Sequence, residues 1–219
     1  MGTGKMTKYL FIDASENATY IQASNSNTYF NQIFDTHRNL GAKITEICDE
    51  MLQKAAVANN EIERFIVCTG PGSLTGLRVA NSFLRTLAFL SERPLAGIDL
   101  FTWTAATLKA DGKRGKVCLM APTLIDKAFA VEVDLNTDLA LYQPEPKLLE
   151  NRLPHSEMPT FGIRWQNAGI EKVTPTPEAL HHLIETQKAN SPDFSELLKI
   201  LPLYIIPSQA ERKLEEKKC

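Results

Sequence analysis

The chain has 219 residues, of which 43% are hydrophobic and 23% are charged, so it is long enough to bury one sizeable core or two small ones. A net charge of -2 gives no global attraction to nucleic acid or to an anionic membrane, and we expect no strong direct nucleic-acid binding. No apolar run approaches the ~20 residues that cross a bilayer, and we expect a cytoplasmic protein without membrane contact.

The four cysteines are far apart in the sequence, and none forms a C-x-x-C pair: Cys48, Cys68, Cys118 and Cys219. Three of them lie within apolar patterns, which is typical of buried, reduced thiols. We therefore expect neither a disulfide framework nor a metal site.

Strands are predicted at residues 8–14, 18–23 and 28–34, and the turn signal Asn25-Ser26-Asn27 indicates an antiparallel meander. Residues 37–58 then carry apolar side chains at helical spacing, which predicts a first long helix with one apolar stripe. The stripe consists of Leu40, Ile44, Ile47, Cys48, Met51, Leu52 and Ala55.

A glycine-containing turn follows a short apolar strand predicted at residues 65–68 and leads into a helix that Ser73 caps and that continues to about residue 90. Free backbone N–H groups at such a helix start attract anions. No Lys-Ser or Lys-Thr pair follows the last glycine, and the spacing differs from the dinucleotide fingerprint. We favour a tight structural turn and keep the alternative of an anion-binding turn, formed by Gly70, Gly72, Ser73, Thr75 and Gly76.

The second half carries weaker signals. Strands are predicted at residues 94–98, 117–121, 128–133 and 161–163, and helices at 101–109, 177–189 and 208–218. The proline-rich residues 144–159 predict a loop, and residues 111–115 a charged break. We expect an N-terminal subdomain at residues 6–100, a smaller one at 101–207 and a charged tail at 208–219.

The helix after the glycine turn is apolar over about half its circumference, wider than the ~100° stripe that packs on one sheet. Its second contact is either the 37–58 helix of the same chain or a partner subunit. In the second case the two helices would present a joint apolar face, burying on the order of 800 Å² per partner. The candidate interface residues are His37, Leu40, Ile44, Ile47, Met51, Leu77, Ala80, Phe83, Leu84 and Leu87.

The segment from Gly70 to Arg78, G-P-G-S-L-T-G-L-R, resembles the G-P-G-S-F-T-G-L/V-R segment of the TsaB (YeaZ) family, which assists the formation of threonylcarbamoyladenosine on tRNA. Residues 11–15, F-I-D-A-S, are similar to the opening I-D-T-A/S strand of that family. His37 and Leu40 resemble its H-S-x-x-L helix start, and residues 202–204, P-L-Y, its late P-x-Y-x-R element. The similarity extends over residues 8–101.

This resemblance implies an actin-like, ASKHA-type α/β fold with two subdomains, each with a mixed sheet and flanking helices, the second one reduced. It also implies a non-catalytic scaffold without a cofactor of its own. In such a system a TsaD-like protein carries the metal and the transfer chemistry, and a TsaE-like ATPase joins the complex. The N-terminal helices would bind TsaD or form a homodimer, with ATP or ADP possible only at the partner boundary.

Two other functions stay open. A small ASKHA-type phosphotransferase or ATPase would hold phosphate at the glycine turn and a metal ion at Asp13. However, residues 13–16, D-A-S-E, contain no glycine and add a carboxylate that repels ATP, so we expect no catalytic residues. An orphan relative that serves another partner is the third interpretation, because the chain departs from the family pattern at Ile98-Asp99, at residues 125–127 and at Ile206.

Overall fold

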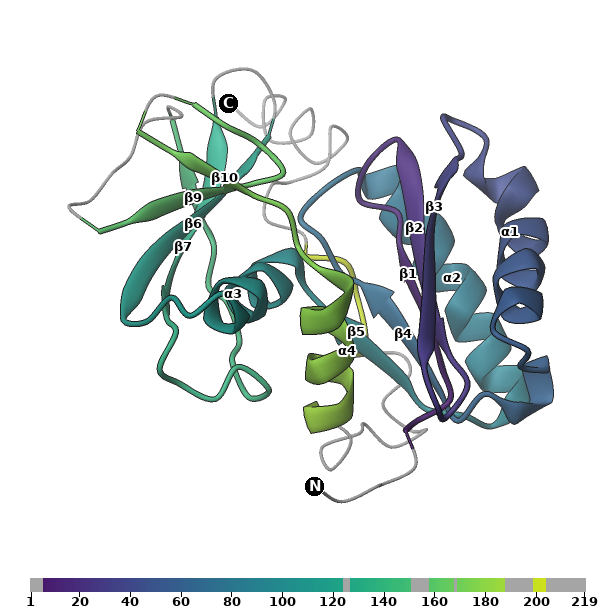
Figure 1. The fold of residues 1–219 in the computed structure, drawn as a ribbon. Coiled ribbons are helices and arrows are strands. Elements are labelled where there is room, and N and C mark those ends of the chain that lie inside the picture. Colours follow the sequence, from purple (N-terminus) through teal and green to yellow (C-terminus); the bar gives the residue numbers. More distant parts are fainter. Residues whose placement is uncertain (1–5, 124–126, 151–157, 168, 188–198, 204–219) are drawn as a thin grey trace.

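The computed structural model describes residues 6–123, 127–150, 158–167, 169–187 and 199–203, and its strands form two five-stranded mixed sheets (Figure 1). The predicted α/β class is therefore confirmed. The predicted helix at 208–218, Ile206 and residues 125–126 lie outside the described residues.

The first sheet has the strand order β3-β2-β1-β4-β5. Its first three strands form the predicted meander, because β2 pairs antiparallel with both β1 and β3. The other two strands run parallel to β1. Strand β1 therefore pairs antiparallel with β2 on one side and parallel with β4 on the other. The strands are β1 (Tyr9–Asp13), β2 (Ala18–Ser24), β3 (Tyr29–Asp35), β4 (Arg64–Cys68) and β5 (Leu95–Ile98).

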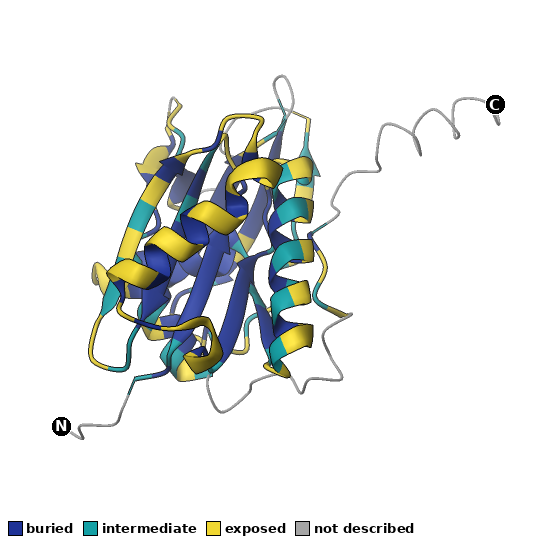
Figure 2. Cartoon of the chain, turned by 90° about the vertical axis from the view of Figure 1, so that its right-hand side faces the viewer, coloured by how far each residue is buried: buried dark blue, intermediate teal, exposed yellow. Residues whose placement is uncertain are grey.

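Helices α1 (Leu40–Lys54) and α2 (Leu74–Ser91) cover the outer face of this sheet (Figures 1 and 2). The first helix is shorter than the predicted 37–58 at both ends. Arg38 has a φ of 55° and Ala56 a φ of 51°, and an α-helix cannot continue through the left-handed region. His37 therefore lies before the helix and not in its first turn.

The second sheet has the order β10-β9-β6-β7-β8. Its strands are β6 (Lys116–Pro122), β7 (Ala128–Asp134), β8 (Lys147–Leu149), β9 (Thr160–Ile163) and β10 (Glu171–Val173). Strand β8 falls inside the predicted loop 144–159. The prolines in this segment argue against a strand. However, Pro144 and Pro146 precede an edge strand, where a missing backbone N–H donor is tolerated.

Two helices, α3 (Leu100–Ala110) and α4 (Pro177–Thr186), lie between the two sheets (Figure 1). Alternation along β1 explains this layering. Leu10 and Ile12 point to α1 and α2, whereas Tyr9 and Phe11 belong to the core cluster shared with α3, α4 and the second sheet. No helix in the described part of the chain is long and apolar enough to cross a membrane.

Helix α4 is fastened to the first sheet by a chain of polar contacts. The Tyr9 hydroxyl lies 3.1 Å from Nδ1 of His181, and Nε2 of Gln22 donates to the same hydroxyl at 2.7 Å. The His181 ring also stacks on Tyr29, with ring centroids 4.9 Å apart. A histidine from the second half of the chain is thus part of the packing of the first sheet.

Candidate functional site

The glycine turn lies at the carboxyl edge of the first sheet, where the parallel strands β1 and β4 end at Asp13 and Cys68. Ligand sites of open α/β sheets gather at this edge. The turn contains a cis peptide bond between Gly70 and Pro71, and Gly70 has a φ of 102°, which favours glycine.

The two later glycines allow α2 to start against the backbone that follows β1. A Cβ on Gly72 would lie 2.4 Å from the carbonyl oxygen of Ser15, and one on Gly76 would lie 2.1 Å from that of Ala14. Both separations are shorter than any real carbon–oxygen contact. These glycines therefore serve close packing, which is what a tight structural turn requires.

The chain itself uses several of the N–H groups at this helix start. The Ser73 amide donates to the Ser15 carbonyl at 2.7 Å, and the Ser73 hydroxyl accepts from the Gly76 amide at 3.3 Å as the N-cap. Thr75 is exposed on the first turn of α2. The anion-binding role of the turn stays a prediction.

A charge cluster next to this turn joins the two halves of the molecule. Arg164, which follows β9, donates through Nη2 to Oδ2 of Asp13 at 2.7 Å and through Nη1 to Oγ of Ser15 at 3.2 Å. Glu16 lies farther out, 3.8 Å from Nη1. The second carboxylate oxygen of Asp13, Oδ1, accepts the Ser15 amide at 2.9 Å.

The guanidinium of Arg164 also lies over the ring of Trp103, 5.8 Å from the centroid, and so is held on two sides. Burial acts to lower the pKa of this guanidinium, but Asp13, Glu16 and Cys68 together outweigh burial and raise the pKa above its ordinary value. The Asp13 side chain is only 1% exposed. Sequence reasoning missed Arg164, whose one signal is a charge directly after the predicted strand at 161–163.

Among the described residues, no group of three or more His, Cys, Asp or Glu side chains is arranged to hold a metal ion. Cys48, Cys68 and Cys118 are free and buried, as predicted for them.

Most of the candidate interface residues lie in the chain's own core, beneath α1 and α2. Seven side chains are no more than 8% exposed: Leu40, Ile44, Ile47, Met51, Leu77, Ala80 and Leu84. They pack between the two helices and the first sheet, so the expectation that they form an outer apolar face needs correction. His37 is exposed, and Phe83 and Leu87 are partly buried.

The outward surface of α1 is polar. Residues exposed along it include Lys43, Glu46, Asp49, Glu50 and Gln53. Its apolar stripe is therefore used up inside the chain, and α1 does not contribute a broad apolar face (Figure 2).

Helix α2 differs, because an apolar stripe on one of its flanks is only partly covered. Val79, Phe83, Leu87 and Leu90 recur at spacings of four, four and three and so share one side of the helix. The first three are partly buried and pack against the core cluster beneath α1 and α2, and Leu90 is 73% exposed. We call these four residues the α2 stripe.

The opposite flank of α2 is covered by a short segment from the end of the described chain. Nδ2 of Asn81 donates to the carbonyl oxygen of Ile200 at 3.0 Å, and Nη2 of Arg85 donates to the same oxygen. The Leu203 amide donates to the Thr69 carbonyl at 2.8 Å. The width of the apolar surface of α2 is thus explained in part by its neighbours, α1 and residues 200–203.

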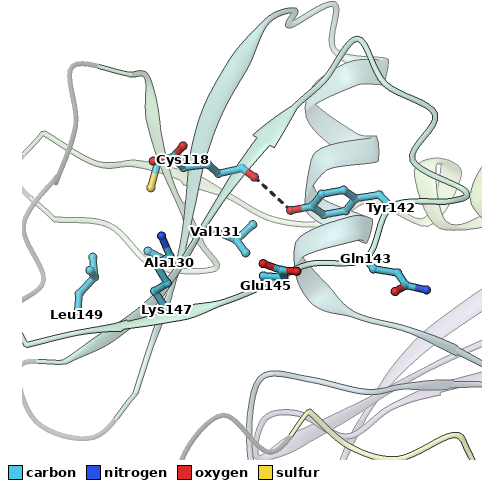
Figure 3. Close-up of a pocket in the computed structure, with 9 residues that line it drawn as sticks. Cys118, Ala130, Val131, Tyr142, Gln143, Glu145, Lys147 and Leu149 are labelled. Atoms are coloured by element: carbon cyan, nitrogen blue, oxygen red, sulfur yellow. Dashed lines mark hydrogen bonds between the residues drawn. The ribbon is translucent and has the colours of Figure 1, made fainter.

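A hollow of about 400 Å³ lies on the second sheet, between β7, β8 and the segment before β8 (Figure 3). The Tyr142 hydroxyl closes one side by donating to the Glu132 carbonyl at 3.2 Å. Burial raises the pKa of Tyr142 to about 12 and also raises that of Cys118. A thiol with a raised pKa is a poor nucleophile, so the hollow holds no activated cysteine.

A model of the family described as "TsaD: tRNA N6-adenosine threonylcarbamoyltransferase" matches residues 29–133, from β3 to β7. Among curated proteins, no sequence relative is found.

Two solved structures from Pseudomonas aeruginosa share the fold. One, an uncharacterized protein with similarity to the peptidase YeaZ, has a TM-score of 0.68 at 17% identity and covers 92% of this chain and 100% of its own. The other, YeaZ itself, has a TM-score of 0.67 at 18% identity and covers 91% of this chain and 100% of its own.

The comparisons agree with the motif resemblance. The chain has the fold of YeaZ, with the predicted two mixed sheets and flanking helices, and the structural and family matches are both consistent with the TsaB (YeaZ) family.

Proposed function

We propose that this chain, which has the fold of YeaZ and matches the TsaD family model over residues 29–133, is a non-catalytic partner of a TsaD-type threonylcarbamoyltransferase. It would act as a scaffold in the formation of N6-threonylcarbamoyladenosine on tRNA. A TsaE-type ATPase would join through the complex, and the isolated chain would form a homodimer. Any ATP or ADP would sit at the boundary with the partner.

The observation that supports this proposal is the α2 stripe. Apolar residues at spacings of four, four and three along a partly exposed flank are an arrangement that a second helix can cover. Phe89, one position before Leu90, is 63% exposed. Large exposed apolar side chains that gather on one element mark interaction sites.

A phosphotransferase or ATPase is less well supported by the same geometry. Such an enzyme would need the Asp13 carboxylate for a metal ion, but Oδ2 faces Arg164 and Oδ1 accepts the Ser15 amide. The glycine turn is packed against Ala14 and Ser15, where a phosphate would need open space.

Reconstitution tests the proposal. A purified TsaD-type protein and a TsaE-type ATPase, with tRNA and the threonylcarbamoyl donor, are assayed with and without this chain, and modified adenosine is measured in the hydrolysed tRNA. We expect modification only when the chain is present. Modification that is equally fast without it, or ATP turnover by the chain alone, would refute the scaffold role.

The same assay distinguishes the scaffold role from the orphan interpretation, in which the chain serves another partner. A chain that assembles into a homodimer but neither binds nor stimulates the TsaD-type protein would serve another partner. That result would contradict the proposal while leaving the α2 stripe as an interaction surface.

A further inference from the structure

An ion pair between Arg164 and Asp13 joins the region of the second sheet to the first sheet. The pair spans 151 positions of sequence and connects the end of β9 with the end of β1. It is largely shielded from solvent, with side-chain exposures of 18% for Arg164 and 1% for Asp13. A shielded pair with short contacts fixes geometry better than an exposed one.

The backbone at Arg164 is also unusual. Its φ is 57°, in the left-handed region that residues with a Cβ adopt rarely, and its amide donates to the Val173 carbonyl at 2.7 Å. Such a conformation persists when surrounding contacts hold it, and it directs this side chain from the second sheet toward β1.

The residues that Arg164 contacts lie directly beneath the start of α2. The Ser15 hydroxyl accepts a hydrogen bond from the Arg164 guanidinium, and the Ser15 carbonyl accepts one from the Ser73 amide at 2.7 Å. The same carbonyl is the atom that a Cβ on Gly72 would strike. Residues 13–16 are therefore held between Arg164 on one side and the glycine turn on the other.

We propose that Arg164 is a positioning residue that latches the second half of the molecule to residues 13–16 and, through Ser15, sets the position of the start of α2. This deepens the proposed function, on which its consequence for partner binding rests, because the α2 stripe begins at Val79, six residues after the Ser73 cap. Loosening Ser15 shifts the N-terminal turns of α2 relative to α1.

Amide hydrogen exchange on the full-length chain tests the latch without any partner. Arg164→Met removes the charge and keeps a long side chain, whereas Arg164→Lys keeps the charge and loses the two-pronged contact. Arg114→Met is the matched control, since Arg114 is exposed and, within the described part of the chain, donates to the nearby carbonyls of Lys109 and Lys113.

In Arg164→Met we expect exchange to rise by about tenfold or more at residues 13–16 and at 73–77, with a smaller rise in Arg164→Lys and none in Arg114→Met. If exchange rises only at 13–16 and stays unchanged at 73–77, the coupling to α2 is refuted. If Arg164→Met does not fold, the same comparison between Arg164→Lys and the wild type decides.

A double-mutant cycle separates the latch from a general loss of stability. Asp13→Asn and Arg164→Met should each raise exchange at 73–77, and the double variant should add little to Arg164→Met, because both changes remove the Asp13–Arg164 ion pair. Fully additive effects would overturn the proposal. Affinity for a TsaD-type protein is measured on the same variants, and a wild type that does not bind would refute the proposed function while the exchange result still tests the latch.

Discussion

Replacing Gly76 by alanine tests the packing role of the glycine turn, because two opposing effects differ in size. In a helix, alanine is favoured over glycine by about 1 kcal/mol. At Gly76, however, the new Cβ would lie 2.1 Å from the Ala14 carbonyl oxygen, and this neighbour is backbone that cannot rotate away. Overpacking of this kind costs ~1–3 kcal/mol, and a backbone clash places it at the upper end of that range.

The net expectation for Gly76→Ala is a loss of ~2 kcal/mol in the free energy of unfolding, which for a chain of this size lowers Tm by about 4–8 °C. Gly41→Ala is the matched control in α1, where nothing lies within 4 Å of the added Cβ. There we expect a gain of up to about 1 kcal/mol.

Both variants are measured by urea denaturation, where the midpoint should move in opposite directions with an unchanged slope. If Gly76→Ala were as stable as Gly41→Ala, the start of α2 would not be pressed against Ala14. The assignment of the turn to close packing would then be refuted, and an open anion-binding turn would regain support.

Two further predictions concern burial and protonation. Leu84→Ala should cost ~2–5 kcal/mol of unfolding free energy, because Leu84 is fully buried. Leu90→Ala, at a 73% exposed site, should stay within about 0.5 kcal/mol of the wild type. Equal losses of the two variants in urea denaturation would contradict the assigned burial. Burial lowers the pKa of His181 below its ordinary value near 6.5, so the stability it contributes is complete above about pH 6.5 and is lost as the pH falls. His181→Gln should therefore flatten the loss of stability as the pH falls below about 6.5, and a pH profile unchanged from the wild type would exclude this role.

Helical periodicity located α1 and α2 well, because each has a continuous apolar side that must be buried. Periodicity could not say how much of that side a partner would see. In α1 the whole apolar stripe is buried, including Ile44 and Met51. In α2 the apolar residues that keep some exposure, such as Val79 and Leu90, lie on the flank next to the buried side chains. How much of each apolar side is buried depends on where the sheet lies, which is set by tertiary structure and not by the local sequence.

The latch illustrates a second limit of sequence reasoning. The sequence singles out Asp13 only as the metal ligand of the phosphotransferase alternative, and its partner Arg164 is 151 positions away. A single charged residue after a short strand does not reveal which distant carboxylate it will meet. Strand β8 was missed for the opposite reason, since its local sequence argues against a strand and only pairing with β7 forms it.

The most direct test of the scaffold proposal is the affinity of a TsaD-type protein for the Leu90→Glu variant, with Leu141→Glu as the control. Leu90 is 73% exposed on the α2 stripe, and Leu141 is 65% exposed in the second half of the chain, so neither change should unfold the protein. We predict that Leu90→Glu weakens binding by at least about tenfold, corresponding to ~1.4 kcal/mol, and that Leu141→Glu does not. Equal and undiminished binding by both variants would contradict the assignment of the α2 stripe as the partner surface.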